Sequence, residues 1–344
     1  MSVVDNDSEG TGLTGLSNVG NSCYLNACLQ ILSHTYELTE VLADGKYKNK
    51  LTKTNDAVLL LEWTKLRTLM WSEDCTIAPW GFVNGVKKVA AIKGKSLFTG
   101  ISQNDVSEFL GFLLESFHMA LARGVDMSIK GTVKNSKDKL AEACYGMMKR
   151  MYEKEYSELL GLFYGISVSQ IISADDGILL SATPEPFSTL ELEIPDTPNP
   201  TLFDCLNNYC ADELLEGDNA YFNETKGIKE SANRRFTFWT LPPVLILGLK
   251  RFTSTNRKIH KFVNAPVDDA DFSPYICGYK GKGSIYELFG VCNHVGGVLG
   301  GHYTAHARIQ DNSWHAFNDT IVTPCGRNHI VTPSAYYFFY RKKK

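Results

Sequence analysis

The sequence predicts an α+β protein, because a helical first part is followed by a part rich in strands. Apolar residues recur at helical spacing within residues 13–160. Short runs of Ile, Val, Phe and Thr begin near residue 162 and are broken by turn signals such as Asp175-Asp176-Gly177. The clearest strands lie beyond residue 244. A block of helices followed by a block of strands is the arrangement typical of the α+β class.

Two segments carry the helical prediction. From Asn26 onward, apolar residues at 28, 29, 31 and 32 suit the buried face of one helix. A second amphipathic helix is indicated by apolar residues at i, i+3, i+4 and i+7, namely Val106, Phe109, Leu110, Leu113 and Phe117.

Five strands are predicted near the C-terminal end of the chain. They are Val244–Leu249, Ile285–Cys292, Tyr303–Ile309, Trp314–Phe317 and Ala335–Tyr340. Residues 310–313, Gln-Asp-Asn-Ser, have the composition of a hairpin turn, so we expect the strands on either side of them to pair.

Composition and charge exclude several classes of protein. The chain has 344 residues and a formal net charge of −3, which argues against a dedicated nucleic-acid binder. We expect no signal peptide and no membrane span, because the N-terminus is polar and no apolar run reaches about 18 residues. The nine cysteines are odd in number and never spaced C-x-x-C. This argues against a disulfide framework and a zinc ribbon, and favours a reducing compartment, the cytoplasm or the nucleus.

One cysteine stands in a distinctive setting. Residues 15–26 read Gly-Leu-Ser-Asn-Val-Gly-Asn-Ser-Cys-Tyr-Leu-Asn, a tight polar loop followed by a helical pattern that starts at Cys23. Backbone N–H groups at a helix N-terminus stabilise a thiolate and can hold an oxyanion. Asn18 could supply a side-chain amide to the same hole. The alternative is a buried cysteine that only caps a helix.

A nucleophilic cysteine needs a base, and His302 is the best placed of eight histidines. It follows the glycine-rich residues 296–301, which we expect to form a mobile loop that lets a substrate backbone approach closely. It also starts a predicted strand, so that a rigid element carries it. His306 and His315 are rivals in or beside neighbouring strands.

The base needs a third group to orient it. Asn318 and Asp319 follow the next predicted strand, across the hairpin, and either could accept a hydrogen bond from the imidazole. Local chemistry does not choose between them.

Five motifs in this order resemble those of the ubiquitin-specific proteases, a family of cysteine deubiquitinases. They are the stretch 15–26, Gln-Asn-Asp-Val-Ser-Glu-Phe-Leu at 103–110, Leu-Pro-Pro-Val-Leu-Ile-Leu-Gly-Leu-Lys-Arg-Phe at 241–252, Gly-Gly-His-Tyr-Thr at 300–304 and Trp-His-Ala-Phe-Asn-Asp at 314–319. The closing residues 335–340, Ala-Tyr-Tyr-Phe-Phe-Tyr, fit the last strand of the family. The resemblance spans residues 13–341.

The resemblance implies a papain-like core in a hand-shaped catalytic domain over 13–341, preceded by a tail at 1–12. A helical thumb would span about 13–160, fingers about 162–245 and a β-rich palm about 246–341. It implies a thiol protease that cleaves after the C-terminal glycine of ubiquitin, acting as a monomer on ubiquitin or ubiquitinated proteins. An inactive ubiquitin-binding module and a protease for a ubiquitin-like modifier are the alternatives.

The same resemblance implies the roles of the site residues. Cys23 would be the nucleophile, His302 the general base and Asn18 the oxyanion-hole amide. Asn318 would be the third member of the triad, and Asp319 is also linked to catalysis. The positions expected to contact the tail of ubiquitin are Gln103, Asp105, Glu108, Gly300, Gly301 and Tyr303.

The fingers depart from the family pattern. Many members carry two C-x-x-C pairs there that bind zinc. In this chain the first pair would fall near Ser173 and Asp176, and the second near Phe222 and Thr225. Because none of these is cysteine, we expect no zinc and no other cofactor.

Overall fold

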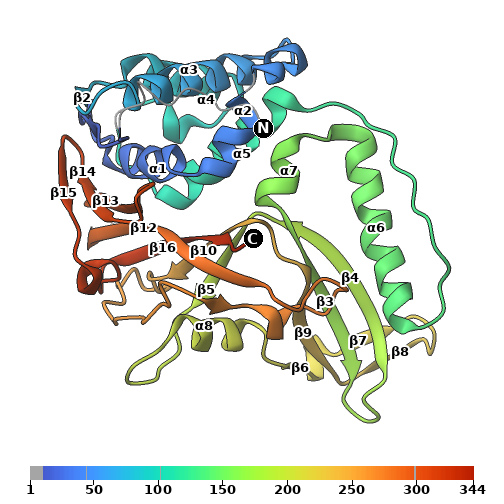
Figure 1. Ribbon diagram of the computed structural model, residues 1–344. Coiled ribbons are helices and arrows are strands. Elements are labelled where there is room, and N and C mark those ends of the chain that lie inside the picture. The colour runs from blue at the N-terminus through green and yellow to red at the C-terminus, as the bar shows by residue number, and fades with distance from the viewer. Residues whose placement is uncertain (1–10, 44, 101, 298–299) are drawn as a thin grey trace.

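The computed structural model describes residues 11–43, 45–100, 102–297 and 300–344. Helices gather in the first half of the chain and strands in the second, which confirms the predicted α+β class. A helical layer lies across one end of a large sheet, and a second, narrower sheet extends away from it (Figure 1). We refer to these three parts as the thumb, the palm and the fingers.

The thumb contains most of the helices. They are α1 (Cys23–Ser33), α2 (Tyr36–Ala43), α3 (Asn55–Met70), α4 (Trp80–Ile92), α5 (Val106–Leu121), α6 (Ser136–Glu155) and α7 (Glu158–Phe163). Two short parallel strands, β1 (Gly15–Leu16) and β2 (Thr76–Ile77), tie the segment before α1 to the segment after α3. The predicted amphipathic helix is α5, and its apolar residues are buried against α1 and α3.

The palm is an eight-stranded, mostly antiparallel sheet. Its path runs β15-β14-β13-β12-β16-β10-β5, and β11 pairs with β12. The strands are β5 (Thr189–Glu193), β10 (Val244–Lys250), β11 (Ala270–Asp271), β12 (Ile285–Gly297), β13 (Gly300–Arg308), β14 (Trp314–Asn318), β15 (Ile321–Pro324) and β16 (Ala335–Lys342). Helix α1 packs directly on β12, β13 and β14, so an early helix of the thumb lies against strands of the palm that are far from it in sequence (Figure 1). Helix α8 (Leu202–Tyr209) packs beside β5.

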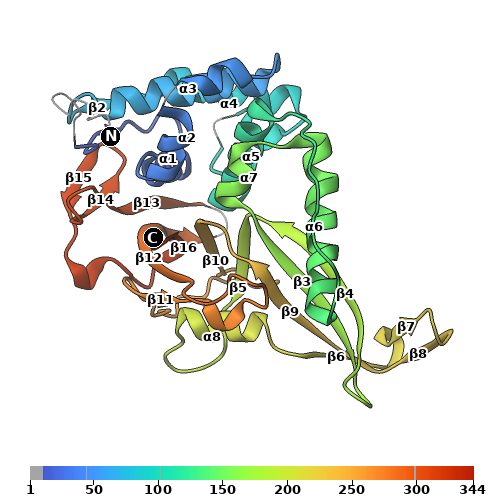
Figure 2. The same cartoon turned by 45° about the vertical axis from the view of Figure 1, so that its right-hand side comes forward.

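The fingers form a separate four-stranded sheet in the order β4-β3-β9-β6. Its strands are β3 (Gly165–Ser173), β4 (Leu179–Phe187), β6 (Glu213–Leu215) and β9 (Ala232–Thr240), and a small hairpin joins β7 (Tyr221–Asn223) to β8 (Ile228–Glu230). Figure 2 shows the hairpin at the far end of this sheet, with α6 alongside β3 and β4.

The predicted strands of the palm are confirmed as β10, β12, β13, β14 and β16. The hairpin between β13 and β14 is also confirmed, since Ile309 N–H donates to Ser313 O at 2.9 Å and Asn312 adopts a φ of 68°. One expectation was wrong. The glycines at 296, 297, 300 and 301 belong to β12 and β13, where Gly296 pairs with Gly301 and Gly297 with Gly300. Residues 298 and 299 lie outside the described residues.

No helix among the described residues is both long and apolar enough to cross a membrane.

Candidate active site

The loop before α1 is shaped by local hydrogen bonds. Asn18 Oδ1 accepts from Ser22 N–H at 3.0 Å, and Ser22 Oγ accepts from Val19 N–H at 2.9 Å. Asn21 adopts the left-handed region at φ 54°, where Asn is tolerated better than most residues. The loop therefore closes tightly, and the helix begins at Cys23, as the sequence predicts.

The Cys23 thiol is 2% exposed and lies under the start of β13. Burial raises its pKa above the ordinary value. The backbone N–H of Tyr303 donates to the sulfur and opposes that rise, the Asp319 carboxylate adds to it, and the N–H groups of Tyr24 and Cys23 itself oppose it. The helix N-terminus thus acts on the thiol in the expected direction, but burial outweighs it. The net result is a pKa of Cys23 above the ordinary value of a thiol.

His302 directly precedes Tyr303, whose backbone N–H donates to the Cys23 sulfur. Its Nε2 lies 2.6 Å from Asn318 Oδ1 on the neighbouring strand β14. Because an amide oxygen only accepts hydrogen bonds, Nε2 carries the proton, and Nδ1 keeps a lone pair with which it can accept one. The rival His306 lies four residues further along β13, and its Nδ1 contacts Ile330 O at 2.9 Å.

Asp319 contacts the loop before α1 and Asn26 of α1 rather than His302. Its Oδ2 accepts from Asn18 Nδ2 at 3.0 Å, and its Oδ1 accepts from Asn26 Nδ2 at 2.7 Å. Its backbone oxygen accepts from Leu16 N–H at 2.8 Å. The two neighbouring residues that sequence chemistry could not separate therefore have different partners: Asn318 bonds the imidazole, and Asp319 bonds the loop that precedes Cys23.

Gln103, just before α5 in the thumb, is hydrogen-bonded to Gly301 on β13 of the palm. Its side-chain amide makes two hydrogen bonds with Gly301, donating from Nε2 to the backbone O at 2.8 Å and accepting from the backbone N–H at 2.8 Å. A Cβ added to Gly301 would lie 2.2 Å from His294 Nε2 and 2.6 Å from Val295 O, so position 301 has no room for a side chain. Gly300, at φ 157°, lies near extended backbone and packs against the same Gln103 side chain.

Asp105 is both a helix cap and a partner of two tyrosines. One oxygen accepts from Ser107 N–H at 2.8 Å, which caps α5. The other accepts from Tyr336 OH at 2.9 Å and from Tyr303 OH at 3.3 Å. The structure thus brings together Gln103, Asp105, Gly300, Gly301 and Tyr303. Glu108 lies in the first turn of α5 and is exposed.

His294 was not identified from the sequence, although it lines the same region. Lys258 Nζ lies 2.9 Å from its Nδ1 and also donates to its backbone oxygen at 2.6 Å. An ammonium group only donates, so Nδ1 is the acceptor and Nε2 carries the proton. Burial, with the nearby Lys258 charge, lowers the pKa of His294 to about 4. The signal that could have found it is its position eight residues before His302, on the partner strand.

A cavity of about 300 Å³ opens between thumb and palm at this place. Its lining combines the two glycines of β13 with Gln103, Asp105 and His294. The cavity therefore presents a carboxylate, amide groups and an imidazole N–H beside a glycine-lined wall.

The fingertip positions do not fit zinc. Ser173, Asp176, Phe222 and Thr225 offer no thiolate or imidazole, and the described residues contain no group of three or more His, Cys, Asp or Glu that could hold a metal ion. Hydrogen bonds and an ion pair hold the tip instead. Asn223 Nδ2 donates to Glu230 Oε1 at 2.5 Å, and Lys226 Nζ lies 2.6 Å from Glu230 Oε2.

Comparison with known proteins identifies the relatives of this chain. The family model described as ubiquitin carboxyl-terminal hydrolase matches residues 14–340. The chain is 32% identical to ubiquitin carboxyl-terminal hydrolase 2 of Rattus norvegicus over 350 residues, covering 97% of this chain and 55% of the relative. It is 33% identical to the Gallus gallus protein of the same name over 344 residues, covering 96% of this chain and 93% of the relative. The chain spans about half the length of several of the curated relatives that it matches.

Solved structures confirm the hand-like fold. The structure of the SAGA Ubp8/Sgf11/Sus1/Sgf73 DUB module bound to ubiquitin aldehyde matches with a TM-score of 0.76 at 22% identity, covering all of this chain and 72% of that one. A monoubiquitin-bound form of the module matches with a TM-score of 0.74 at 23% identity, covering 97% of this chain and 70% of that one. The family model spans nearly the whole chain, and on that ground the chain belongs to the ubiquitin carboxyl-terminal hydrolase family.

Proposed function

We propose that this chain is a cysteine deubiquitinase, which hydrolyses the peptide or isopeptide bond after the C-terminal glycine of ubiquitin. One observation carries the proposal: Cys23, at the start of α1, accepts a hydrogen bond from the residue that follows His302, and His302 is bonded to Asn318. A buried thiol, an imidazole with a free Nδ1 lone pair and an amide that orients the ring are the groups that thiol acyl transfer needs. The proposal includes a monomer in the cytoplasm or the nucleus.

The reaction begins with a proton transfer, because the raised pKa of Cys23 favours the thiol. His302 Nδ1 takes the thiol proton as the sulfur attacks the carbonyl carbon of the terminal glycine. The oxyanion accepts from the Cys23 backbone N–H at the helix N-terminus. It also accepts from the Asn18 side-chain amide once that amide leaves Asp319.

The tetrahedral intermediate collapses when His302 gives the same proton to the leaving amine nitrogen, and a thioester remains on Cys23. A water molecule then attacks the thioester carbon while His302 takes one of its protons. That proton returns to the sulfur as the thioester breaks, which restores the thiol and releases the carboxylic acid of ubiquitin, and the acid then loses its remaining proton to solvent. Asn318 is neutral, so it orients the imidazolium without adding a full charge.

The cavity between thumb and palm is the proposed channel for the tail of ubiquitin. Gly300 and Gly301, which line this cavity, are proposed to form the wall of a narrow channel that selects a tail ending in two glycines. Asp105 is proposed to attract the arginines of the tail, and Glu108 is proposed as an outer contact. The Nε2–H of His294 is proposed to donate to a backbone carbonyl of the tail.

The proposal is tested by turnover of ubiquitin that carries a C-terminal fluorophore, in parallel with ubiquitin-like modifiers bearing the same group. We expect release of fluorophore from ubiquitin and none from a Cys23→Ala variant. Tight binding of ubiquitin without turnover by the parent chain would instead identify a binding module. Turnover of a ubiquitin-like modifier alone would identify a different substrate.

A further inference from the structure

The ring of His294, on β12, is held on several sides by aromatic side chains. His294 is 4% exposed. Its ring centroid lies 4.6 Å from that of Tyr303, 5.7 Å from that of Phe252 and 6.0 Å from that of Tyr336. These three neighbours come from separate segments of the palm, so the plane of the imidazole is fixed. Its two nitrogens therefore keep different surroundings.

Nε2 of His294 is the nitrogen that lies beside the cavity between thumb and palm. His294 and Gly301 both line this cavity. A Cβ at Gly301 would lie 2.2 Å from Nε2, so this nitrogen packs against the glycine wall. Within the described part of the chain, the ring is hydrogen-bonded through Nδ1, and Nε2 has no partner. A molecule in the cavity therefore meets Nε2 rather than Nδ1.

Nδ1 of His294 faces Lys258, which does not line the cavity. The Lys258 ammonium group lies 2.9 Å from Nδ1 and donates to the backbone oxygen of His294 at 2.6 Å. It also lies 5.9 Å from the centroid of the Phe252 ring. Burial, and then the nearby charge of Arg251, lower the pKa of Lys258, and no carboxylate among the described residues offsets them. The two hydrogen-bond contacts of this ammonium group are thus both with His294.

These contacts determine where the neutral imidazole carries its proton. A neutral ring has one N–H and one lone pair, and an ammonium group only donates. Lys258 therefore holds the lone pair on Nδ1 and leaves the N–H on Nε2, beside the cavity. Because burial and the Lys258 charge lower the pKa of His294 to about 4, the ring is neutral between pH 6 and pH 8. Tyr303 and Tyr336 pack against the ring, burial raises the pKa of both, and both hydroxyls donate to Asp105.

We propose that Lys258 is a positioning residue for the substrate: it fixes the tautomer of His294, so that an N–H donor rather than a lone pair faces the tail of ubiquitin. The inference rests on the proposed function, in which this N–H donates to a backbone carbonyl of the tail. A lone pair on Nε2 would repel that carbonyl oxygen without any change in the shape of the channel. Lys258 acts only through His294, since it lies outside the cavity.

The test replaces the donor at position 258 by an acceptor. In Lys258→Glu the carboxylate accepts from Nδ1, directly or through one water molecule, so the neutral ring carries its lone pair on Nε2. We expect KM for the ubiquitin–fluorophore substrate at pH 8 to rise about tenfold, with kcat within about twofold of the parent. Charge alone gives the opposite expectation, because a new carboxylate attracts the arginines of the tail. Lys258→Arg keeps a donor and should stay within about twofold in both constants.

Acid should reverse the effect of Lys258→Glu, which a general loosening of the channel would not do. A carboxylate beside Nδ1 raises the pKa of His294, and the protonated ring carries an N–H on both nitrogens. The KM of Lys258→Glu should therefore approach that of the parent as the pH is lowered from 8 to 6.

The tautomer itself is read from the nitrogen chemical shifts of isotope-labelled histidine, with no substrate present. The signal of His294 is assigned by its loss in His294→Gln. We expect the Nε2–H form in the parent and in Lys258→Arg, and the Nδ1–H form in Lys258→Glu at pH 8.

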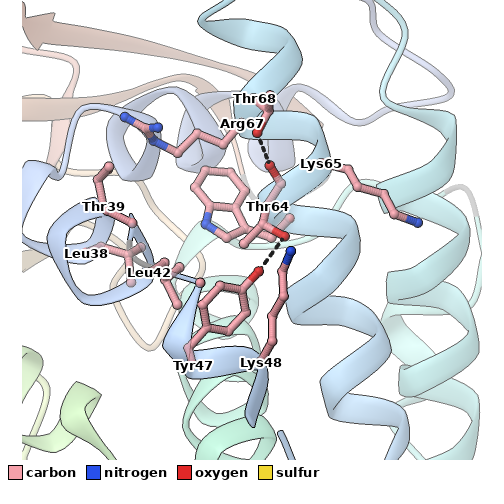
Figure 3. Close-up of a pocket in the computed structure, with 12 residues that line it drawn as sticks. Leu38, Thr39, Leu42, Tyr47, Lys48, Thr64, Lys65, Arg67 and Thr68 are labelled. Carbon is pink, nitrogen blue, oxygen red and sulfur yellow. Dashed lines mark hydrogen bonds between the residues drawn. The ribbon is translucent and has the colours of Figure 1, made fainter. Parts of the chain in front are cut away.

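The matched control is Lys48→Glu, which makes the same change of charge elsewhere in the thumb. Lys48 is exposed and lines a separate cavity of about 410 Å³, which shares no lining residue with the cavity beside Gly301. Figure 3 shows this cavity, with the Lys48 side chain extending toward Thr64. The KM of Lys48→Glu should stay within about twofold of the parent at both pH values.

An Nδ1–H tautomer in the parent would overturn the proposal, and so would an unchanged KM in Lys258→Glu once its tautomer has changed. If Lys258→Glu does not fold, Lys258→Met is measured, in which both tautomers should be populated. A ring that stays wholly in the Nε2–H form there would show that Lys258 does not set the tautomer. Absence of turnover in the parent would contradict the proposed function instead, and the affinities of the same variants for ubiquitin would then decide the role of Lys258.

Discussion

Acid should lower the free energy of unfolding of this protein through protonation of His34. This residue lies at the end of α1, the helix that begins at Cys23. His34 is fully buried between Trp71 and Phe317, with ring centroids 5.4 Å from each. Its Nδ1 contacts Gln30 O at 2.8 Å and Ser33 Oγ at 3.0 Å. Burial is the main reason that the pKa of His34 falls to about 4 from an ordinary value of 6.5. Nearby cationic groups lower it further.

The direction of the effect follows from these two values. As the pH falls below 6.5, the unfolded chain binds a proton at this residue, but the folded chain resists until the pH nears 4. The free energy of unfolding therefore decreases across that window, and the loss is complete below it. Between pH 7 and pH 5, a shift of this size removes about 2 kcal/mol of stability.

The variant His34→Phe keeps a ring between Trp71 and Phe317 but cannot titrate. We expect it to be less stable at pH 7 by about 1–2 kcal/mol, because it loses the contacts of Nδ1. Its loss of stability between pH 7 and pH 5 should be smaller than that of the parent by about 2 kcal/mol. Urea unfolding at both pH values, followed by tryptophan fluorescence, measures both quantities.

The control is His260→Phe, at an exposed position, which should leave the pH dependence of the parent unchanged. Equal pH dependence in His34→Phe and the parent would refute the reasoning, because it would mean that His34 does not contribute to acid sensitivity. The His34 ring packs at a tilt against Phe317, the residue before Asn318, so the same acid range should loosen the packing between α1 and β14.

Four further outcomes are expected. Asn318→Ala removes the 2.6 Å contact with His302 and should lower kcat/KM by about 10- to 100-fold in the ubiquitin–fluorophore assay; an unchanged rate would contradict the orienting role. Gly301→Ala places a Cβ 2.2 Å from His294 Nε2 and 2.6 Å from the backbone oxygen of Val295, so it should lower both Tm and kcat/KM, the latter by about 100-fold or more; a variant as stable and as active as the parent would show that strands β12 and β13 can shift to make room. Asp319→Asn removes a carboxylate that raises the pKa of Cys23, so the pH profile of iodoacetamide alkylation should move to lower pH; no movement would assign the raised pKa to burial alone. Elemental analysis should find no stoichiometric zinc and a chelator should leave Tm unchanged; one bound equivalent would contradict the proposed fingertip.

Short sequence patterns predicted those elements whose formation depends on residues close together in the chain. The start of α1 at Cys23 follows from a polar loop that meets an apolar helical face, and the hairpin before Trp314 follows from its turn residues. The pairing of Asn318 with His302 follows from a short hairpin, because a register between adjacent strands is set by the turn.

Features that depend on distant contacts could not be predicted in the same way. Lys258 and His294 are separated by 36 residues, and nothing in either segment alone indicates that they meet. Strand β5 lies in the range expected for the fingers, but it pairs in parallel with β10 of the palm. Glycine is usual in loops, so the glycines of 296–301 predict one from the sequence alone. Here a tight approach to His294 requires glycine within a strand.

The hydrogen bonds of Asp319 have a consequence for the order in which this chain folds. Asn18 and Asp319 are 301 positions apart, and Asn26 and Asp319 are 293 apart. During synthesis from the N-terminus, the loop before Cys23 leaves the ribosome long before its partner exists. Contacts this distant in sequence form late, because a long chain must first be closed. The loop before Cys23 is therefore translated well before Asp319, and a chain that has not yet reached Asp319 carries the Cys23 thiol without the hydrogen bonds that fix this loop.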